Sequence, residues 1–284
     1  MFRLKLNGND VFYERFTFPG GEEHVKIRPA GIPVARIQEV DIFAHIKSST
    51  DFIELALLVN AVRGLFNVGR LTEFRLEIPY FPYARQDRQC DFGEPTSLNW
   101  AASFINSMNF DHVVVKDPHS NVTPALVNNI EVISQDSLVR KYLGWFIRGN
   151  NAVLVAPDGG AAKKTETLSL SLGGVPIVYG HKNRDTKTGE ILGVSINNPE
   201  LIEGRYLVVV DDICDGGRTF VELGKELMKH KPKHMTLFVT HGIFSKGLSV
   251  FDGIYDAVYA DTIWWENITA DGVPFKLENT GRVK

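Results

Sequence analysis

The strongest chemical signal in the sequence is the segment Val208–Thr219, which reads Val-Val-Val-Asp-Asp-Ile-Cys-Asp-Gly-Gly-Arg-Thr. An apolar run typical of a buried strand leads into Asp211 and Asp212, and a turn containing Gly216 and Gly217 precedes a helical pattern. Carboxylates accept hydrogen bonds from ribose hydroxyls, and backbone N–H groups at the start of a helix bind phosphate. The segment therefore predicts a sugar-phosphate site, with an acidic helix cap at a strand end as the structural alternative.

A second polar segment, Tyr80–Arg88, mixes aromatic and charged residues and also follows a strand pattern. Arg85 and Arg88 could neutralise a polyphosphate and stack on a base, because a guanidinium group binds phosphate in a bidentate manner and lies flat on rings. Gln86 adds amide hydrogen bonding. A solvated loop is the alternative, but the interleaved aromatic residues favour a shaped binding wall.

Two more polar segments follow strand patterns. His119, in Lys116–His119, could bind a metal ion or could be a structural histidine. Asp158, in Ala156–Lys164, could contact a sugar or a metal-bound water. The second segment resembles a phosphate-binding P-loop only superficially, because Ala162 stands where that motif requires glycine before its lysine.

A pair of cations, Lys182 and Arg184, precedes the turn signal Thr186–Glu190, and we expect them on a mobile loop or hairpin. Alternate residues of an extended segment project to the same side, so the two cations could clamp a transferring phosphoryl group. A solvated edge is the alternative. The sequence suggests no nucleophilic triad and has no zinc-type spacing of cysteine and histidine.

Strand patterns and helix patterns alternate along the chain around these polar segments. A 3.6-residue apolar period predicts helices at Phe52–Phe66, Leu98–Met108, Ser137–Phe146 and Phe220–Met228. Mostly apolar runs, typical of strands buried on both faces, predict strands at Asp41–Ile46, Glu73–Tyr80, His112–Lys116, Ala152–Ala156, Val175–Tyr179, Tyr206–Val210, Met235–Thr240 and Ile254–Ala260. This alternation indicates an α/β fold with parallel sheets. The pattern restarts near residue 150, which predicts domains at residues 1–148 and 149–284.

Bulk composition excludes several classes of protein. The 284 residues have a formal net charge of −3, so we expect no nucleic-acid or membrane partner. No run approaches the ~18 apolar residues of a membrane span, and the first residues lack the apolar core of a signal peptide. Cys90 and Cys214 do not make a disulfide framework. We therefore expect a cytoplasmic protein.

Taken in order, these segments resemble the ribose-phosphate pyrophosphokinase (phosphoribosyl pyrophosphate synthetase) family. The segments that carry the resemblance are Phe18–Glu22, Tyr80–Arg88, Asp117–Ser120, Ala156–Lys164, Lys182–Arg184, Asp211–Thr219, Thr240–Phe244 and Asp261–Ile263. Each is a weak or moderate signal alone, whereas the ordered set is highly specific.

The resemblance implies two phosphoribosyltransferase-like doubly wound domains with largely parallel sheets, the first on the ATP side and the second on the sugar-phosphate side. It also implies Mg²⁺ as the cofactor, ATP and a ribose phosphate as substrates, and a homo-oligomer that is a dimer or larger. By the same resemblance, ATP would contact Phe18, Glu22, Arg85, Gln86, Asp87 and Arg88. The sugar phosphate would contact Asp158, Asp211, Asp212, Asp215, Gly216, Gly217, Arg218 and Thr219. The catalytic residues would be Lys182, Arg184, His119 and Arg85, and the metal would be bound by His119 and Asp158.

The sequence departs from the family pattern at several positions. Gly20 replaces an aspartate near the adenine, Ala161 replaces a glycine, and Gly216 and Arg218 alter the sugar-phosphate loop. The family's C-terminal helix is not expected, because little sequence follows Asp261.

The expected reaction transfers the β,γ-diphosphate of ATP to the 1-hydroxyl of ribose 5-phosphate. Because Gly216 opens space and Arg218 adds a cation, a larger 5-substituted ribose such as ADP-ribose is an alternative acceptor. A phosphoribosyltransferase and a catalytically silent partner of a synthetase are further alternatives. The first explains neither Tyr80–Arg88 nor His119, and the retained Lys182 and Arg184 argue against the second.

Overall fold

The computed structural model of the chain describes residues 2–28, 37–65, 72–184, 191–264 and 277–278. The chain forms two compact units, Met1–Ile133 and Ser134–Lys284. All but the last residue of helix α4 (Gln135–Gly149) comes before the domain boundary expected at residues 148/149, yet the helix packs against α5 (Gly159–Ser171) and lies in the second unit. No helix in the described ranges is long and apolar enough to cross a membrane.

The first unit is built on a seven-stranded sheet with the order β3-β2-β1-β4-β5-β6-β7 among its described residues. Strands β4 to β7 run parallel, whereas β1, β2 and β3 join them through antiparallel pairs. The strands span Phe2–Leu6, Asn9–Thr17, Glu23–Arg28, Glu39–Ala44, Glu73–Glu77, His112–Lys116 and Ile130–Ile133. The helices are α1 (Ser49–Leu65), α2 (Ser97–Ser107) and α3 (Val122–Leu126).

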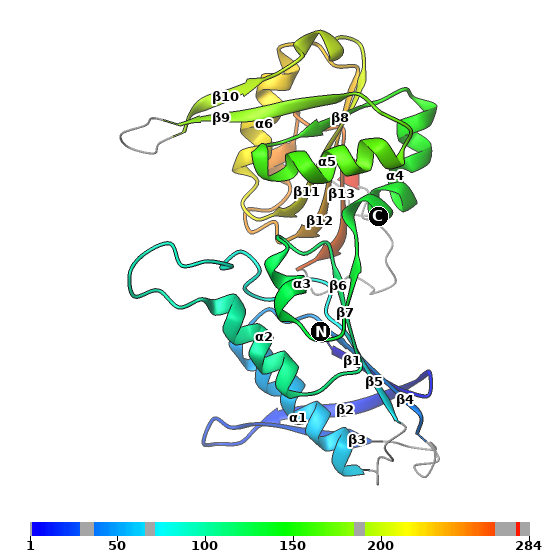
Figure 1. Cartoon of the computed structure of the whole chain (residues 1–284), viewed down its shortest axis with the longest axis vertical. Helices are drawn as coiled ribbons and strands as arrows, with labels where there is room; N and C mark the ends of the chain where they lie inside the picture. The colour runs from blue at the N-terminus through cyan, green and yellow to red at the C-terminus, as the bar shows by residue number, and fades with distance from the viewer. Residues whose placement is uncertain (1, 29–36, 66–71, 185–190, 265–276, 279–284) are drawn as a thin grey trace. The chain divides into compact units, whose positions relative to one another are not determined.

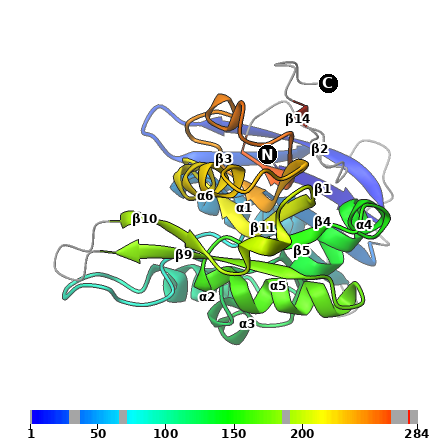
Figure 2. The same cartoon turned by 90° about the horizontal axis from the view of Figure 1, so that it is seen from above.

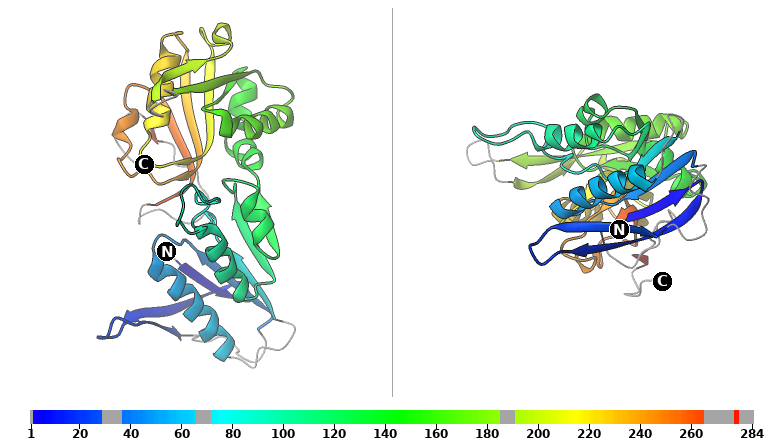
Figure 3. Two further views of the ribbon diagram at one scale, coloured as in Figure 1. Left: turned by 60° about the vertical axis from the view of Figure 1, so that its left-hand side comes forward. Right: turned by 90° about the horizontal axis from the view of Figure 1, so that it is seen from below.

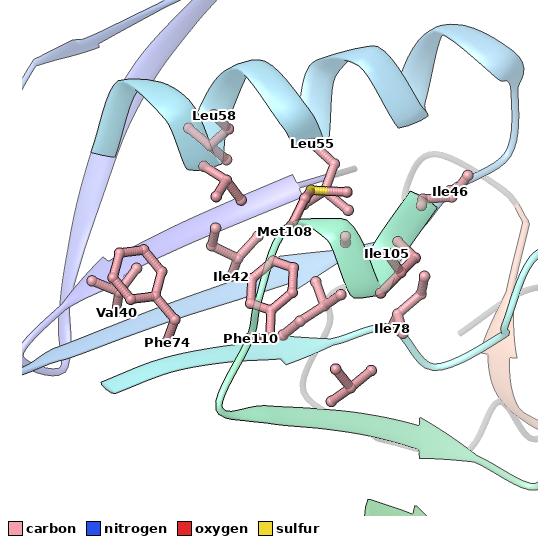
Figure 4. Close-up of a cluster of buried hydrophobic side chains, with 14 of the residues drawn as sticks. Val40, Ile42, Ile46, Leu55, Leu58, Phe74, Ile78, Ile105, Met108 and Phe110 are labelled. Carbon is pink, nitrogen blue, oxygen red and sulfur yellow. The ribbon is translucent and has the colours of Figure 1, made fainter. Parts of the chain in front are cut away.

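One face of this first sheet carries the core of the unit. Alternate residues of the parallel strands, such as Val40 and Ile42 in β4 and Phe74 in β5, pack against Leu55 of α1 and Ile105 of α2 (Figure 4). Helices α1 and α2 lie together on that face (Figure 3, left). The strands therefore alternate between buried and more exposed positions, as expected when one face is covered.

The second unit is built on a sheet with the order β10-β9-β8-β11-β12-β13-β14 among its described residues. Strands β8, β9, β11, β12 and β13 are parallel, and β10 and β14 are antiparallel edges. The strands span Val153–Ala156, Ile177–Arg184, Ile191–Ile196, Tyr206–Cys214, His234–Gly242, Ala257–Ile263 and Leu277–Glu278. Beside α4 and α5, the unit contains α6 (Arg218–Met228) and two short 3₁₀ turns at Pro199–Leu201 and Ser249–Phe251.

This second sheet is buried on both faces. Val209 and Leu237 belong to a core that includes Leu223 of α6. On the opposite face, Val208 and Phe238 are 0% exposed, and the ring of Phe238 lies 6.3 Å from that of Tyr142 in α4. Helices α4 and α5 cover this second face (Figure 1).

The α/β class with largely parallel sheets is confirmed. Of the two arrangements expected for Lys182 and Arg184, the structure shows the paired strands of a hairpin rather than a loop. Both residues lie in strand β9, where their backbones pair with Val194 and Ile191 of the antiparallel strand β10. The two strands lie side by side, with α5 beside β9 (Figure 2). The turn signal Thr186–Glu190 lies outside the described residues.

Candidate functional site

Three carboxyl groups of the second unit lie at the carboxyl ends of neighbouring parallel strands. Asp158 follows β8, and Asp211 and Asp212 lie near the end of β11, which pairs with β8. Asp158 is also the N-cap of α5, and its Oδ1 accepts hydrogen bonds from the N–H groups of Gly160 (3.0 Å) and Ala161 (3.3 Å). This edge of an open parallel sheet is where ligands commonly bind.

The carboxyl groups of this cluster influence one another. Burial raises the pKa of Asp211 well above its usual range, and the charges of Asp212 and then Asp158 raise it further. The Asp212 side chain is also buried, and the Asp212 backbone N–H donates a 2.9 Å hydrogen bond to Asp211 Oδ1. A cluster of this kind favours ligands that bring hydrogen-bond donors or positive charge. Ribose hydroxyls and hard cations both meet that requirement.

The loop after β11 ends in the N-terminus of α6. Gly217 is the residue before the helix and has a φ of 78°, and a Cβ there would lie 2.8 Å from Cζ of Phe251. Only glycine fits this position, for reasons of both backbone conformation and space. Arg218 opens the helix, but its Nε lies 2.6 Å from Oε1 of Glu222, so its guanidinium is already engaged in an ion pair. Thr219 is partly buried in the first turn.

The loop after β5 in the first unit carries the expected nucleotide-binding residues. Tyr83 adopts a left-handed φ of 60° and packs its ring against Phe52 and Trp100, with centroids 6.1 and 5.9 Å away. Two backbone hydrogen bonds hold Gln86: its N–H donates to the Tyr83 carbonyl, and its own carbonyl accepts from the N–H of Leu98. The side chains of Arg85, Gln86 and Arg88 are exposed, and that of Asp87 is partly buried.

The loop after β6 is tied to the loop after β5. The Lys116 N–H donates to the Pro79 carbonyl (3.0 Å), and the Asp117 N–H donates to the Ile133 carbonyl (2.8 Å). Asp117 is buried and has a φ of 39°, a conformation that non-glycine residues adopt rarely. These constraints place His119, which is exposed, beyond a fixed turn at the carboxyl edge of the first sheet.

The β2–β3 hairpin carries Phe18 and Glu22. Phe18 is 45% exposed and belongs to a group of rings with Phe16 and His24, whose centroids lie 5.2 and 5.4 Å away. A Cβ at Gly20 would lie 3.0 Å from Oε2 of Glu22. The Glu22 carboxylate therefore lies beside the space that the family's aspartate side chain would enter.

Sequence reasoning missed the residue that fixes this hairpin. The guanidinium group of Arg15 pairs with Glu23 of the hairpin at 2.9 Å and with Glu54 of α1 at 2.6 Å, while the Tyr13 hydroxyl donates to Glu54. The signal was present as alternating polar residues in Asn9–Thr17, but nothing in the sequence pairs them with a distant helix.

The metal prediction names residues from both units, His119 from the first and Asp158 from the second. Within the described ranges no group of three or more His, Cys, Asp or Glu side chains forms a metal centre. A single carboxylate such as that of Asp158 still supplies the oxygen donor that Mg²⁺ prefers, which fits a largely hydrated Mg²⁺ carried by substrate phosphates and held by one or two carboxylates.

Comparisons with known proteins agree with this arrangement. A model of the phosphoribosyl transferase domain matches residues 127–265. Ribose-phosphate pyrophosphokinase 2 of Saccharomyces cerevisiae is 31% identical over 197 residues, which are 69% of this chain and 59% of the yeast protein. The chain thus aligns with less than two thirds of that relative.

Two longer alignments extend the similarity. A ribose-phosphate pyrophosphokinase of Vibrio parahaemolyticus is 27% identical over 294 aligned positions, covering 99% of this chain and 85% of that protein. The crystal structure of phosphoribosylpyrophosphate synthetase from Mycobacterium smegmatis superposes with a TM-score of 0.74 and 21% identity, over 90% of this chain and 81% of that one. The fold therefore consists of phosphoribosyltransferase-type α/β units, and the chain is similar along nearly its whole length to ribose-phosphate pyrophosphokinases.

Proposed function

We propose that the chain is an ATP-dependent pyrophosphokinase that transfers the β,γ-diphosphate of ATP to the 1-hydroxyl of ribose 5-phosphate, giving phosphoribosyl pyrophosphate and AMP. The observation that carries the proposal is the carboxyl cluster of Asp158, Asp211 and Asp212, which lies on neighbouring strands, with β11 running on to a glycine turn at the start of α6. The names of the relatives support the same activity.

The second unit would hold the sugar phosphate. Asp211 and Asp212 would accept hydrogen bonds from the ribose hydroxyls, and this contact would offset the burial and the mutual repulsion that together raise the pKa of Asp211. The backbone from Asp215 to Thr219 would receive the 5-phosphate, because N–H groups at a helix N-terminus attract anions.

The first unit would hold ATP. Arg85 and Arg88 are exposed cations on an anchored loop and suit the polyphosphate, while Gln86 adds a polar contact. Phe18 offers an exposed ring for the base, with Glu22 beside it.

The chemistry requires positioning and charge neutralisation more than covalent catalysis. The 1-hydroxyl oxygen attacks the β-phosphorus in line, the bond to the α,β-bridging oxygen breaks, that oxygen leaves with AMP, and the hydroxyl proton is released. Mg²⁺, when bound with the phosphates, supplies charge neutralisation and orientation, and we propose His119 and Asp158 as the residues that face it. Lys182 and Arg184 would stabilise the charge of the transferring group.

Two further parts of the proposal concern the assembly and location of the enzyme and its preferred acceptor. We propose that it acts as a homo-oligomer, a dimer or larger, in the cytoplasm. Ribose 5-phosphate is preferred over ADP-ribose as the acceptor, because the ion pair with Glu222 engages the Arg218 cation on which the larger acceptor depended.

The direct test is to incubate the full chain with ATP, Mg²⁺ and ribose 5-phosphate and to measure AMP and phosphoribosyl pyrophosphate. We expect both products in equal amounts. Omission of the sugar should abolish AMP formation. Consumption of phosphoribosyl pyrophosphate with a free base would instead indicate a phosphoribosyltransferase, and no turnover in either assay would indicate a silent partner subunit.

The role of the cations in β9 can be tested separately. Lys182→Ala should lower kcat by roughly 10²–10³, as loss of one preorganised electrostatic donor does elsewhere, with little change in ATP binding. Lys225→Ala, an exposed lysine on α6, is the control with the same change in charge. A kcat close to that of the unaltered chain would show that Lys182 is a solvated edge residue.

A further inference from the structure

The loop after β11 is held by a second loop that follows β12. The N–H groups of Ile243 and Phe244 donate to the Cys214 carbonyl at 2.8 and 3.2 Å. Ser245 then binds Asp215 twice, through its N–H to the carbonyl at 3.2 Å and through its hydroxyl to Oδ1 at 2.7 Å. The residue after Ser245 is therefore held beside the proposed phosphate-binding turn.

That next residue is Lys246, and its side chain runs along Gly216. A Cβ at Gly216 would lie 3.7 Å from each of Cγ, Cδ and Cε of Lys246, and these are the three nearest atoms it would meet. The lysine stem thus lies in van der Waals contact with the space above the glycine, and its ammonium group is one bond further on. A larger side chain at position 216 would compete with the lysine for that space.

The charged residues near the turn before α6 differ in whether they are available to bind an anion. Asp215 contributes a negative charge, and Arg218 is engaged by Glu222. Within the described parts of the chain, the Lys246 ammonium makes no hydrogen bond or ion pair, and its side chain is exposed. An anion at the start of α6 would therefore find Lys246 as the available cation, and this cation would offset the Asp215 carboxylate.

We propose that Lys246 binds the 5-phosphate of the sugar substrate and so helps to determine acceptor specificity. The inference rests on the proposed function, since it concerns the same sugar-phosphate loop. The α6 N-terminus alone offers neutral N–H donors to the phosphate, and Lys246 adds a charge-assisted hydrogen bond from above Gly216. The sequence pointed to Arg218 as an added cation of this loop, suited to a larger acceptor, whereas the structure favours as the phosphate-binding cation a residue 28 positions later.

The experiment measures ribose 5-phosphate in two ways. Lys246→Ala should raise KM for ribose 5-phosphate roughly tenfold to a hundredfold, the usual loss for one charge-assisted hydrogen bond, with kcat nearly unchanged. Calorimetric binding of ribose 5-phosphate to the full chain without ATP should weaken by the same factor. Binding of ribose, which lacks the phosphate, should not change.

Three variants besides Lys246→Ala, each measured for turnover and for ribose 5-phosphate binding, distinguish the possible outcomes. Lys246→Arg should retain most of the affinity for ribose 5-phosphate. Lys225→Ala should match the unaltered chain, since this substitution also removes one positive charge but does so on α6, away from the turn. If Arg218→Ala weakens ribose 5-phosphate and Lys246→Ala does not, the inference is overturned while the proposed reaction stands. If the unaltered chain forms no AMP yet binds ribose 5-phosphate through Lys246, the reaction is wrong and the inference stands. If it neither reacts with nor binds ribose 5-phosphate, both are wrong.

Discussion

The two sheets of this chain have similar strand orders but differ in what covers their second face. In the second unit, Val208 and Phe238 are fully buried beneath helices α4 and α5. In the first unit, the corresponding face shows Lys5, Asp41 and Arg75, which lie side by side across β1, β4 and β5. One sheet is thus an interior layer, and the other presents a charged face within the described residues.

The side chains on the charged face of the first sheet form a regular pattern of charges. Together with Arg3, Phe43 and Glu77, its side chains line a hollow of about 260 Å³. Oppositely charged residues alternate across the strands, and the Arg3 guanidinium lies 4.9 Å from the centre of the Phe43 ring. Cross-strand pairs of this kind stabilise a sheet without an apolar cover, although each contributes little.

The same strand order is thus stabilised in two different ways in the two units. Where helices cover both faces, transfer of apolar surface from water dominates. Where one face is open, exposed ion pairs and partial burial replace that term, and these are individually weak. Substitutions on this face should therefore lower the free energy of unfolding more in the second sheet than in the first.

The largest expected difference is between two phenylalanines. Phe238→Ala should destabilise the second unit by about 3–5 kcal/mol, because it opens a cavity under α4. Phe43→Ala should cost less, about 1 kcal/mol, since its ring is only partly buried and loses mainly its contact with Arg3. Chemical denaturation with hydrogen exchange of the β12 and β4 amides measures both. Equal costs would show that the open face is buried in solution.

A smaller effect concerns the carboxyl cluster. Because the native pKa of Asp211 is raised, the native state binds its proton more tightly than the unfolded chain. The free energy of unfolding should then fall as pH rises above the ordinary value of about 3.9, with a slope of up to about 1.4 kcal/mol per pH unit, until the native carboxyl ionises. Asp211→Asn should remove this slope and stabilise the chain at neutral pH.

Thermal or urea unfolding between pH 4 and pH 8 tests whether the free energy of unfolding falls as pH rises. Asp252→Asn, at an exposed position in the same unit, is the control. The buffer range spans the region just above the ordinary aspartate pKa of about 3.9. If Asp211→Asn and the unaltered chain differ by a constant amount at every pH, the carboxyl titrates normally and the cluster is open to water. Asp211→Asn should also weaken ribose 5-phosphate binding, which separates function from stability.

The smallest effect concerns His112, the first residue of β6 in the first sheet. Hydrogen bonds to Glu73 (2.7 Å) and then to Glu131 (2.8 Å) raise the pKa of His112. The raised value means that the stabilisation is complete below the unfolded value of about 6.5 and is lost as pH rises through the native pKa. NMR titration of the ring protons should show the higher pKa, and Glu73→Gln should lower it more than Glu131→Gln. An unchanged pKa in both variants would contradict the pairing.

Much of the fold could be predicted because local patterns were strong. The strand at His112–Lys116 was predicted with both its ends, and the helix expected at Phe220–Met228 begins two residues earlier. Helix α5 was missed because its buried residues follow no clean apolar period, and Asp158, read as a ligand contact, is also its cap. The antiparallel strands β1 to β3 were missed because their alternating, charged sequences lack the apolar runs that marked the other strands.

The residue types that carry the chemistry could be recognised from the amino-acid sequence, since acids, arginines and glycines at strand ends stand out by their spacing. Which of these residues lie close together depends on the three-dimensional fold. The pairing of β8 with β11 brings Asp158 to Asp211, 53 positions apart, and the β12 loop brings Lys246 to Gly216. Sheet register and loop anchoring are long-range properties that no local pattern encodes, because the contacts that set them come from strands distant in sequence. The same reason explains why Arg218 looked available in sequence and is paired in the structure.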